Sequence, residues 1–342
     1  MRRTPVLLLA AALGSALVAS GAVADTTTTT STSTTTTTEA TTTTTLKPVY
    51  VAPLTGLPDP TGVTRHRAAL TIKIDNTPEA HPQYGIEDAD DVFEEIVEGG
   101  ITRLAAIFDT RYPTQVGPVR SVRRTDREIV FPIRGVFAFS GGAEYAVRSI
   151  ETAPVKLYDQ SNAGAAMWRD PDRYPPHNLF ANAALLMEMA HETVPPPPLF
   201  TYQAPKGVAP GRPVASFVVG FQSGFAVTYT WDTATRSWDR SIFGAPDVAA
   251  TGQRISPKNV VVMSVNYIGG VGVIDSYAEL VGSGPVQVFT RGTLQKGTWS
   301  RRSLRKRAVF KNAQGQVINL TPGQTFVELL DVSEQVTVTP RP

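Results

Sequence analysis

The sequence of 342 residues contains no cysteine. This absence excludes disulfide bonds, thiolate metal ligands, lipid attachment at a cysteine and every cysteine nucleophile. An excess of one charge is also missing, because 32 basic residues face 30 acidic residues and the formal net charge is +2. Composition therefore gives no general signal for a polyanion partner. With 42% hydrophobic and 18% charged residues, most of the chain can bury a core.

The N-terminus has the features of an export signal. Arg2-Arg3 precede an apolar run over residues 6–18, and Ala22-Val23-Ala24 is a small-x-small cleavage pattern. We expect a signal peptide over residues 1–24 that is cleaved before Asp25. An uncleaved membrane anchor is the alternative, but the run is short for a span of about 20 residues. We therefore expect an exported protein, secreted or associated with the cell wall, and no nucleic-acid partner.

The remaining chain divides by composition. Residues 26–45 contain 16 threonines and two serines, which predicts a disordered stalk over residues 25–48 whose hydroxyls are possible sugar acceptors. The four prolines at 195–198 cannot continue a helix or pair in a central strand, so we place a boundary there. The expected order is a domain at 49–194, a proline-rich linker at 195–213, a second domain at 214–332 and a tail at 333–342.

Local patterns predict a mixed α/β first domain and a mainly antiparallel β second domain. In the first domain, strands are predicted at 68–74, 102–108, 135–139 and 155–158, and helices at 124–131, 143–151 and 182–193. In the second domain, strands are predicted at 214–219, 225–231, 237–242, 260–265, 271–280, 286–291 and 326–330. No internal repeat occurs at a fixed period, which argues against a solenoid or a propeller.

Polar motifs gather in the first domain. They are Lys73-Ile74-Asp75-Asn76, Pro82-Gln83, segments 94–103 and 117–123, Ser140-Gly141-Gly142, Trp168-Arg169 and segment 173–178. In this order, and with segments 53–57, 231–240, 258–262 and 297–299, they resemble the YerB-like lipoprotein family. The resemblance covers residues 49–332 and implies an extracytoplasmic, envelope-associated protein with two family domains and no established reaction. The chain departs from the lipoproteins of that family because it has no cysteine.

Glu94 and Glu98 invite comparison with the paired carboxylates of glycosidases, which lie about 5–9.5 Å apart. Segment 91–98 fits either a strand or a helix. On a strand, four residues rise about 13 Å, which is too far for that mechanism. A helix would bring the two Cβ atoms to about 5–6 Å. We favour the strand, with both glutamates paired to nearby arginines.

His177 is the main candidate for acid–base chemistry. It follows Pro175-Pro176, which stiffen its loop, and it lies beside Asn178. The alternative is a packed histidine bonded to backbone groups. We assign His177 and Glu98 as the candidate catalytic residues. The four histidines show no metal-ligand spacing, so we expect no metal, and the sequence points to no cofactor.

Several arginines lie among apolar and glycine-rich segments, where a buried guanidinium needs a carboxylate partner or a ligand. Asp75, Glu94 and Glu98 are their natural partners, and an arginine left over can bind a carboxylate or a phosphate. Ser140 precedes two glycines at which free N–H groups can bind an anion, although a tight turn is the default there. We assign ligand binding to Asp75, Asn76, Arg103, Arg120, Arg123, Ser140, Arg169, Arg173 and Asn178. We expect one polar site that contains Arg120, Arg123, Glu98, Arg173, His177 and Asn178.

A basic run lies in the second domain, where no acidic residue occurs between Glu279 and Glu328. The run comprises Arg301, Arg302, Arg305, Lys306 and Arg307. It is either a solvated strand face or a surface that attracts an anionic wall polymer or lipid. We expect it to bind polymer in a salt-sensitive manner.

Two functions follow from these patterns. The first is a non-catalytic envelope module that binds an anionic wall polymer or an envelope assembly partner. The second is a hydrolase or transferase of wall glycan or peptide, with His177 as general acid or base and arginines that hold the substrate. Polar clusters mark active sites, but structural ion-pair networks imitate them, so we favour the binding module.

Overall fold

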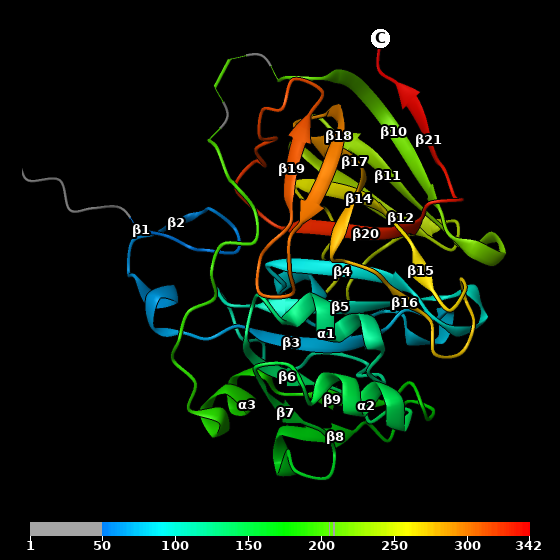
Figure 1. The fold of residues 1–342 in the computed structure, drawn as a ribbon. Coiled ribbons are helices and arrows are strands. Elements are labelled where there is room, and N and C mark those ends of the chain that lie inside the picture. The colour runs from blue at the N-terminus through cyan, green and yellow to red at the C-terminus, as the bar shows by residue number, and fades with distance from the viewer. Residues whose placement is uncertain (1–49, 205, 208) are drawn as a thin grey trace, which may run out of the picture. The chain divides into compact units, whose positions relative to one another are not determined.

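The structure is a computed structural model that describes residues 50–204, 206–207 and 209–342. The expected signal peptide and the expected stalk lie outside these residues. The described chain is mostly β (Figure 1). Its three α-helices are seven or eight residues long. Within the described ranges, no helix is both long enough and apolar enough to span a membrane.

The first half of the described chain contains nine strands and the three helices. These elements are β1 (Tyr50–Val51), β2 (Pro58–Asp59), β3 (Leu70–Asp75), β4 (Asp91–Ile96), β5 (Thr102–Phe108), α1 (Arg124–Val130), β6 (Gly135–Ala138), α2 (Glu144–Ile150), β7 (Val155–Tyr158), β8 (Met167–Arg169), β9 (Leu179–Ala181) and α3 (Ala183–Ala190).

The second half contains strands and no α-helix among its described residues. The strands are β10 (Arg212–Gly220), β11 (Ala226–Asp232), β12 (Ser237–Ile242), β13 (Ala245–Pro246), β14 (Asn259–Val265), β15 (Tyr267–Ile268), β16 (Tyr277–Ala278), β17 (Gly282–Thr290), β18 (Thr293–Arg301), β19 (Val309–Asn312), β20 (Thr325–Asp331) and β21 (Val336–Pro340).

One 15-stranded sheet runs through both halves. Its strand order is β13-β12-β11-β10-β18-β17-β14-β20-β4-β5-β3-β6-β7, with β19 on β18 and β21 on β10. The halves join where β20 pairs in parallel with β4, so that Val327 lies opposite Phe93. Figure 1 shows β20, in red, directly beside β4, in cyan. Every residue of β20 and β4 is buried, as expected for strands covered on both faces.

The hydrophobic core follows the alternation of the strands. In β3, Leu70, Ile72 and Ile74 face one cluster of buried apolar residues, which also includes Leu186 of α3. The intervening side chains of β3 are polar and point to the opposite face of the sheet. A second cluster joins Phe93 of β4 to residues of β10, β14 and β20 and is shared by the two halves. This alternation places charged side chains of β3 under α1.

Several sequence predictions are confirmed and others are corrected. Segment 91–96 is a strand, not a helix. The strand expected at 271–280 is wrong, because the glycines at 269, 270 and 272 have positive φ and Asp275 has φ 64°, which leaves a turn and the two residues of β16. The tail expected at 333–342 contains β21, which pairs with β10. The helix expected for an α/β first domain is limited to three short segments in a mostly β structure, and β18 and β19 were not predicted.

A group of buried carboxyl groups lies where β4 and β5 meet. Asp91 and Asp109 are fully buried, and neither of their carboxyl groups has a hydrogen-bond partner among the described residues. Burial raises the pKa of Asp109 to about 8, with a further contribution from Asp90 and an opposing one from Arg67. Burial, with Asp90 and Asp109 nearby, raises the pKa of Asp91 well above its usual range. Burial therefore favours the protonated form of these carboxyl groups relative to the ionised form.

This group predicts a stability that falls as pH rises. The folded chain holds a proton on Asp109 that the unfolded chain loses near pH 3.8, so stability decreases from there up to about pH 8. Asp109→Asn removes this titration, so the free energy of unfolding of the variant relative to the parent chain should rise by about 1.4 kcal/mol per pH unit between pH 5 and pH 8. Urea denaturation at both pH values measures this. Exposed Asp172→Asn is the control, and equal effects of Asp109→Asn at both pH values would contradict the prediction.

Candidate functional site

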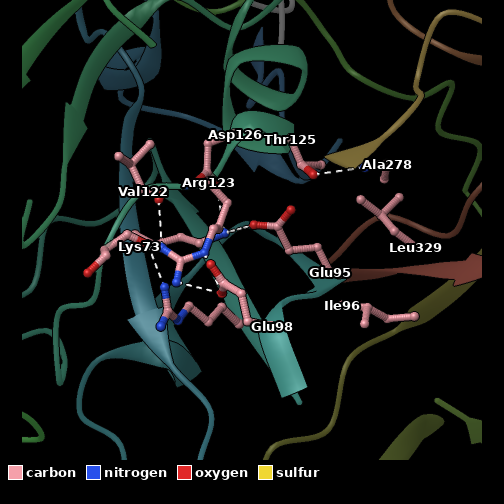
Figure 2. A network of polar contacts seen from close by, with 12 residues as sticks. Lys73, Glu95, Ile96, Glu98, Val122, Arg123, Thr125, Asp126, Ala278 and Leu329 are labelled. Carbon is pink, nitrogen blue, oxygen red and sulfur yellow. Dashed lines mark hydrogen bonds and ion pairs between the residues drawn. The ribbon is translucent and has the colours of Figure 1, made fainter. Parts of the chain in front are cut away.

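The polar face of β3 carries two charged residues, Lys73 and Asp75, and both are fully buried. Lys73 forms an ion pair with Glu95 of β4 and another with Asp126 of α1, whose Oδ1 lies 2.8 Å from Nζ. Asp126 also accepts the backbone N–H of Arg123 at 2.7 Å, which fixes the start of α1. Figure 2 shows Lys73, Glu95, Asp126 and Arg123 in one network. Because every charge here has a partner, these residues form a structural ion-pair network.

Asp75 brings together two side chains from distant segments. Its Oδ2 lies 2.7 Å from Nδ1 of His177 and 2.9 Å from Nε of Arg120. Segment 117–123 reaches this place because it runs beside β3: the Arg120 N–H donates to the Lys73 carbonyl at 2.8 Å, and the Asp75 N–H donates to the Pro118 carbonyl at 2.9 Å. Arg120 and His177 therefore meet on one carboxylate oxygen.

Two more arginines lie beside this group. Arg103 of β5 is opposite Asp75 in the β3–β5 register. It is 7% exposed, and one of its guanidinium nitrogens donates to the Ser121 carbonyl at 3.1 Å. Burial lowers the pKa of Arg103 to about 10, with Arg123 and Arg120 lowering it further against Glu98 and Asp75. We call Arg103, Arg120, Arg123, Asp75, Glu98 and His177 the arginine cluster.

Glu98 closes the other side of the arginine cluster. Arg123 donates to Glu98 Oε2 from Nε at 2.8 Å and from Nη2 at 2.7 Å (Figure 2). Burial would raise the pKa of Glu98, but the hydrogen bond and charge of Arg123 lower it below the usual value. Glu98 is thus an ionised partner of an arginine. Glu94 instead accepts from Arg240 of β12, so the two glutamates are not a catalytic pair.

Comparison with known proteins connects this geometry to a family. Two profiles, the N-terminal and C-terminal domains of a protein family of unknown function (DUF3048), match residues 54–195 and 217–327. The chain belongs to this family. It is 33% identical over 142 residues to "Putative lipoprotein YerB" of Bacillus subtilis (strain 168), and this match spans 41% of the chain and 43% of that protein. The crystal structure of Bacillus subtilis YerB matches with a TM-score of 0.73 at 24% identity over 84% of this chain and 99% of that one.

The arginine cluster lies entirely within the N-terminal DUF3048 domain. The C-terminal domain reaches it indirectly: Arg240 is fully buried and pairs with Glu94, while Glu94 accepts from Asn76 at 3.0 Å. The Asn76 Oδ1 in turn accepts from Gln83 at 3.2 Å. Asn76, expected as a ligand contact, is therefore buried among protein groups. Sequence reasoning missed Arg240, whose signal was an arginine in a strand beside the apolar Trp238.

The other candidates lie around the arginine cluster without joining it. Arg173 donates to the carbonyls of Glu79, Ala80 and Pro82. Arg169 donates to Asn178 at 2.7 Å and to a glutamine. The Ser140 N–H donates to the Arg120 carbonyl at 2.9 Å, in the turn that was the default expectation. In the described residues, no group of three His, Asp or Glu side chains has the arrangement of a metal site.

The basic run of the second half is divided by the structure. Arg302, Arg305 and Lys306 are exposed. Arg301 is 5% exposed and donates to four backbone carbonyls, including that of Glu128 at 2.8 Å, so its assignment to polymer binding is wrong. Arg307 is half-buried and donates to Thr201. Arg301, the first residue of the run, is thus the buried last residue of β18, whereas the sequence pattern indicated an exposed residue.

The ion pairs of Lys73 predict a large cost of removing its charge. Lys73→Met leaves Glu95 and Asp126 buried without a cation, which should lower the free energy of unfolding by about 3–5 kcal/mol in denaturant titrations. Lys156→Met is the matched control, because Lys156 also lies in a strand but pairs with Glu192 at the surface. That control should cost less than about 1 kcal/mol. Similar losses in both variants would contradict a structural role of the buried network.

Proposed function

We propose that this protein is an extracytoplasmic, envelope-associated binding module whose N-terminal domain holds an anionic group at the arginine cluster. The relative named as a lipoprotein supports the envelope location. Attachment through a cysteine-linked lipid does not apply to this chain, because it has no cysteine. The anionic group is a phosphate or carboxylate of a wall polymer or of an assembly partner.

The observation that carries this proposal is the missing partner of Arg103. Arg120 pairs with Asp75 and Arg123 pairs with Glu98, but Arg103 has no carboxylate of its own among the described residues. Its Nε is buried and makes no hydrogen bond with a described residue. Three guanidinium groups therefore face two carboxylates. An anionic ligand would balance the third charge, and a guanidinium matches the planar fork of a carboxylate or phosphate.

Access to the arginine cluster is compatible with a ligand from solvent. The side chains of Arg120, Arg123 and Glu98 are 19%, 14% and 31% exposed, whereas Asp75 is fully buried. The cluster therefore has a buried floor of fixed geometry and a rim that water reaches. A rim of this kind allows an anion to exchange, while the floor holds the arginines in place before binding.

The proposal predicts that inorganic phosphate stabilises the chain through Arg103. At about ten times its Kd, phosphate should contribute roughly 1.4 kcal/mol and raise the Tm of the full chain by about 2–5 °C relative to chloride of equal ionic strength. Arg103→Gln should abolish this rise. Differential scanning calorimetry measures both.

Arg301→Gln is the matched control for this experiment. Arg301 is also a buried arginine with a pKa lowered to about 10 by burial, but backbone carbonyls satisfy it. This variant should have a lower Tm and keep the full phosphate response. A phosphate response that survives in Arg103→Gln, or that is absent from the parent chain, would contradict the proposed anion site.

A second candidate function is favoured by the contact between Asp75 and His177. A carboxylate on Nδ1 orients an imidazole, so that Nε2 can act as a general acid or base. Thr77 Oγ1 lies 3.3 Å from the same Nδ1. This arrangement supports hydrolysis or transfer on wall glycan or peptide, with the arginines holding an anionic substrate.

This second function predicts the release of soluble fragments from purified cell walls. His177→Gln should reduce the release about 10²–10⁴-fold while its Tm stays close to that of the parent chain. Exposed His191→Gln is the control and should keep full activity. Fragment release is measured as new reducing or amino ends. If the parent chain releases no more fragments than buffer alone, the hydrolase or transferase function is wrong and the binding module is favoured.

A further inference from the structure

A polar hollow lies in the second half of the described chain. It has a volume of about 360 Å³ and is bordered by the segment around Gln203, by the β17–β18 turn and by the hairpin that follows β19. Five side-chain amides line it: Gln203, Gln295, Asn312, Gln316 and Asn319. We call it the amide hollow. Its volume lies in the range of small-ligand sites, about 300–1,000 Å³.

Hydrogen bonds between these side chains hold the amide hollow in shape. Asn319 Nδ2 donates to Gln203 Oε1 at 2.9 Å, which joins two segments more than a hundred residues apart. Asn312 Nδ2 donates to Gln316 Oε1 at 3.0 Å, and the Asn312 Oδ1 accepts the Gln316 N–H at 3.0 Å. Each amide has both a donor and an acceptor, so these bonds leave further groups of both kinds for a ligand. The amides are thus positioned before binding.

The charge of the amide hollow is positive. Arg291 and Lys206 line it, and none of the described lining residues is acidic. Arg291 donates to the Gly207 carbonyl at 2.6 Å, while its buried Nε makes no hydrogen bond with a described residue. The segments that border the hollow come from two stretches of sequence without acidic residues. No Asp or Glu occurs between Glu192 and Asp232 or between Glu279 and Glu328. A cationic ligand would therefore find no carboxylate partner among the described lining residues.

We propose that the amide hollow binds an oligosaccharide that carries negative charge. A sugar ring presents hydroxyls that both donate and accept, which is the complement of side-chain amides with both capacities. The exposed side chain of Val317 provides an apolar surface for the C–H groups of a ring. The two cations favour an anionic saccharide over a neutral one. This site is separate from the arginine cluster, which lies in the N-terminal family domain.

Isothermal titration of the full chain with tetragalacturonate tests this proposal, with neutral chitotetraose as the uncharged probe. Tetragalacturonate should bind, and the double variant Gln203→Ala, Asn319→Ala should weaken binding at least about tenfold, since each lost hydrogen bond contributes about 0.5–1.5 kcal/mol. Arg291→Gln should weaken binding and reduce its dependence on salt. Exposed Gln314→Ala is the matched control, because this amide lies in the same hairpin but does not line the hollow.

Each outcome bears on a defined part of the proposal. Equal affinity in the parent chain and in the double variant, or no binding by the parent chain, would overturn the site. Equal affinity for tetragalacturonate and chitotetraose would overturn the preference for negative charge. Gln316→Ala provides a second test should the double variant unfold. The double variant Gln203→Ala, Asn319→Ala should keep the rise in Tm that phosphate causes at the arginine cluster, because neither residue belongs to that cluster, so failure here is distinguishable from failure of the anion site.

Discussion

The buried ion pair between Arg240 and Glu94 is the interaction on which the rest of the structure depends. Arg240 belongs to β12 and Glu94 to β4, so the pair joins the two family domains beside the parallel pairing of β20 with β4. Both side chains are fully buried. Removing one partner of such a pair leaves an uncompensated charge in the interior, which costs about 3–5 kcal/mol. The two domains are therefore bound to one arrangement by charge as well as by strand pairing.

This junction also positions the arginine cluster. Glu94 accepts from Asn76 and Thr102, and Asn76 accepts from Gln83, so the chain that leaves β3 is held on several sides. Asp75, one residue earlier, is thereby fixed where Arg120 and His177 reach it. Side chains two residues apart on a strand share a face, which is why Lys73 and Asp75 are neighbours. Lys73 pairs with the two carboxylates of Glu95 and Asp126, whereas Arg103, which lies opposite Asp75, forms no ion pair with a described residue.

The sequence predicted strands and helices better than it predicted which charged side chains pair with one another. Strands such as β3 and β5 follow from β-branched and aromatic content, and the helix α1 follows from helix-compatible spacing. The segment 271–280 had strand composition, but glycines with positive φ and tertiary contacts made it a turn. Which arginine pairs with which carboxylate depends on register between distant strands. For that reason Arg240 was missed as the partner of Glu94, and Arg301 was taken for an exposed residue.

The formal net charge does not describe the surface, because the buried charged residues are mostly acidic. Twelve acidic but four basic residues are buried among the described ones. The acidic residues are Asp59, Asp75, Asp90, Asp91, Glu94, Glu95, Asp109, Asp126, Glu128, Asp247, Glu328 and Asp331, and the basic ones are Lys73, Arg103, Arg240 and Arg301. The fold thus withdraws carboxylates from the surface, and the exterior is more basic than the formal charge of +2 indicates. A basic surface attracts anionic polymers over about a Debye length. Composition alone does not show this surface, because a sum over the sequence does not separate buried from exposed groups.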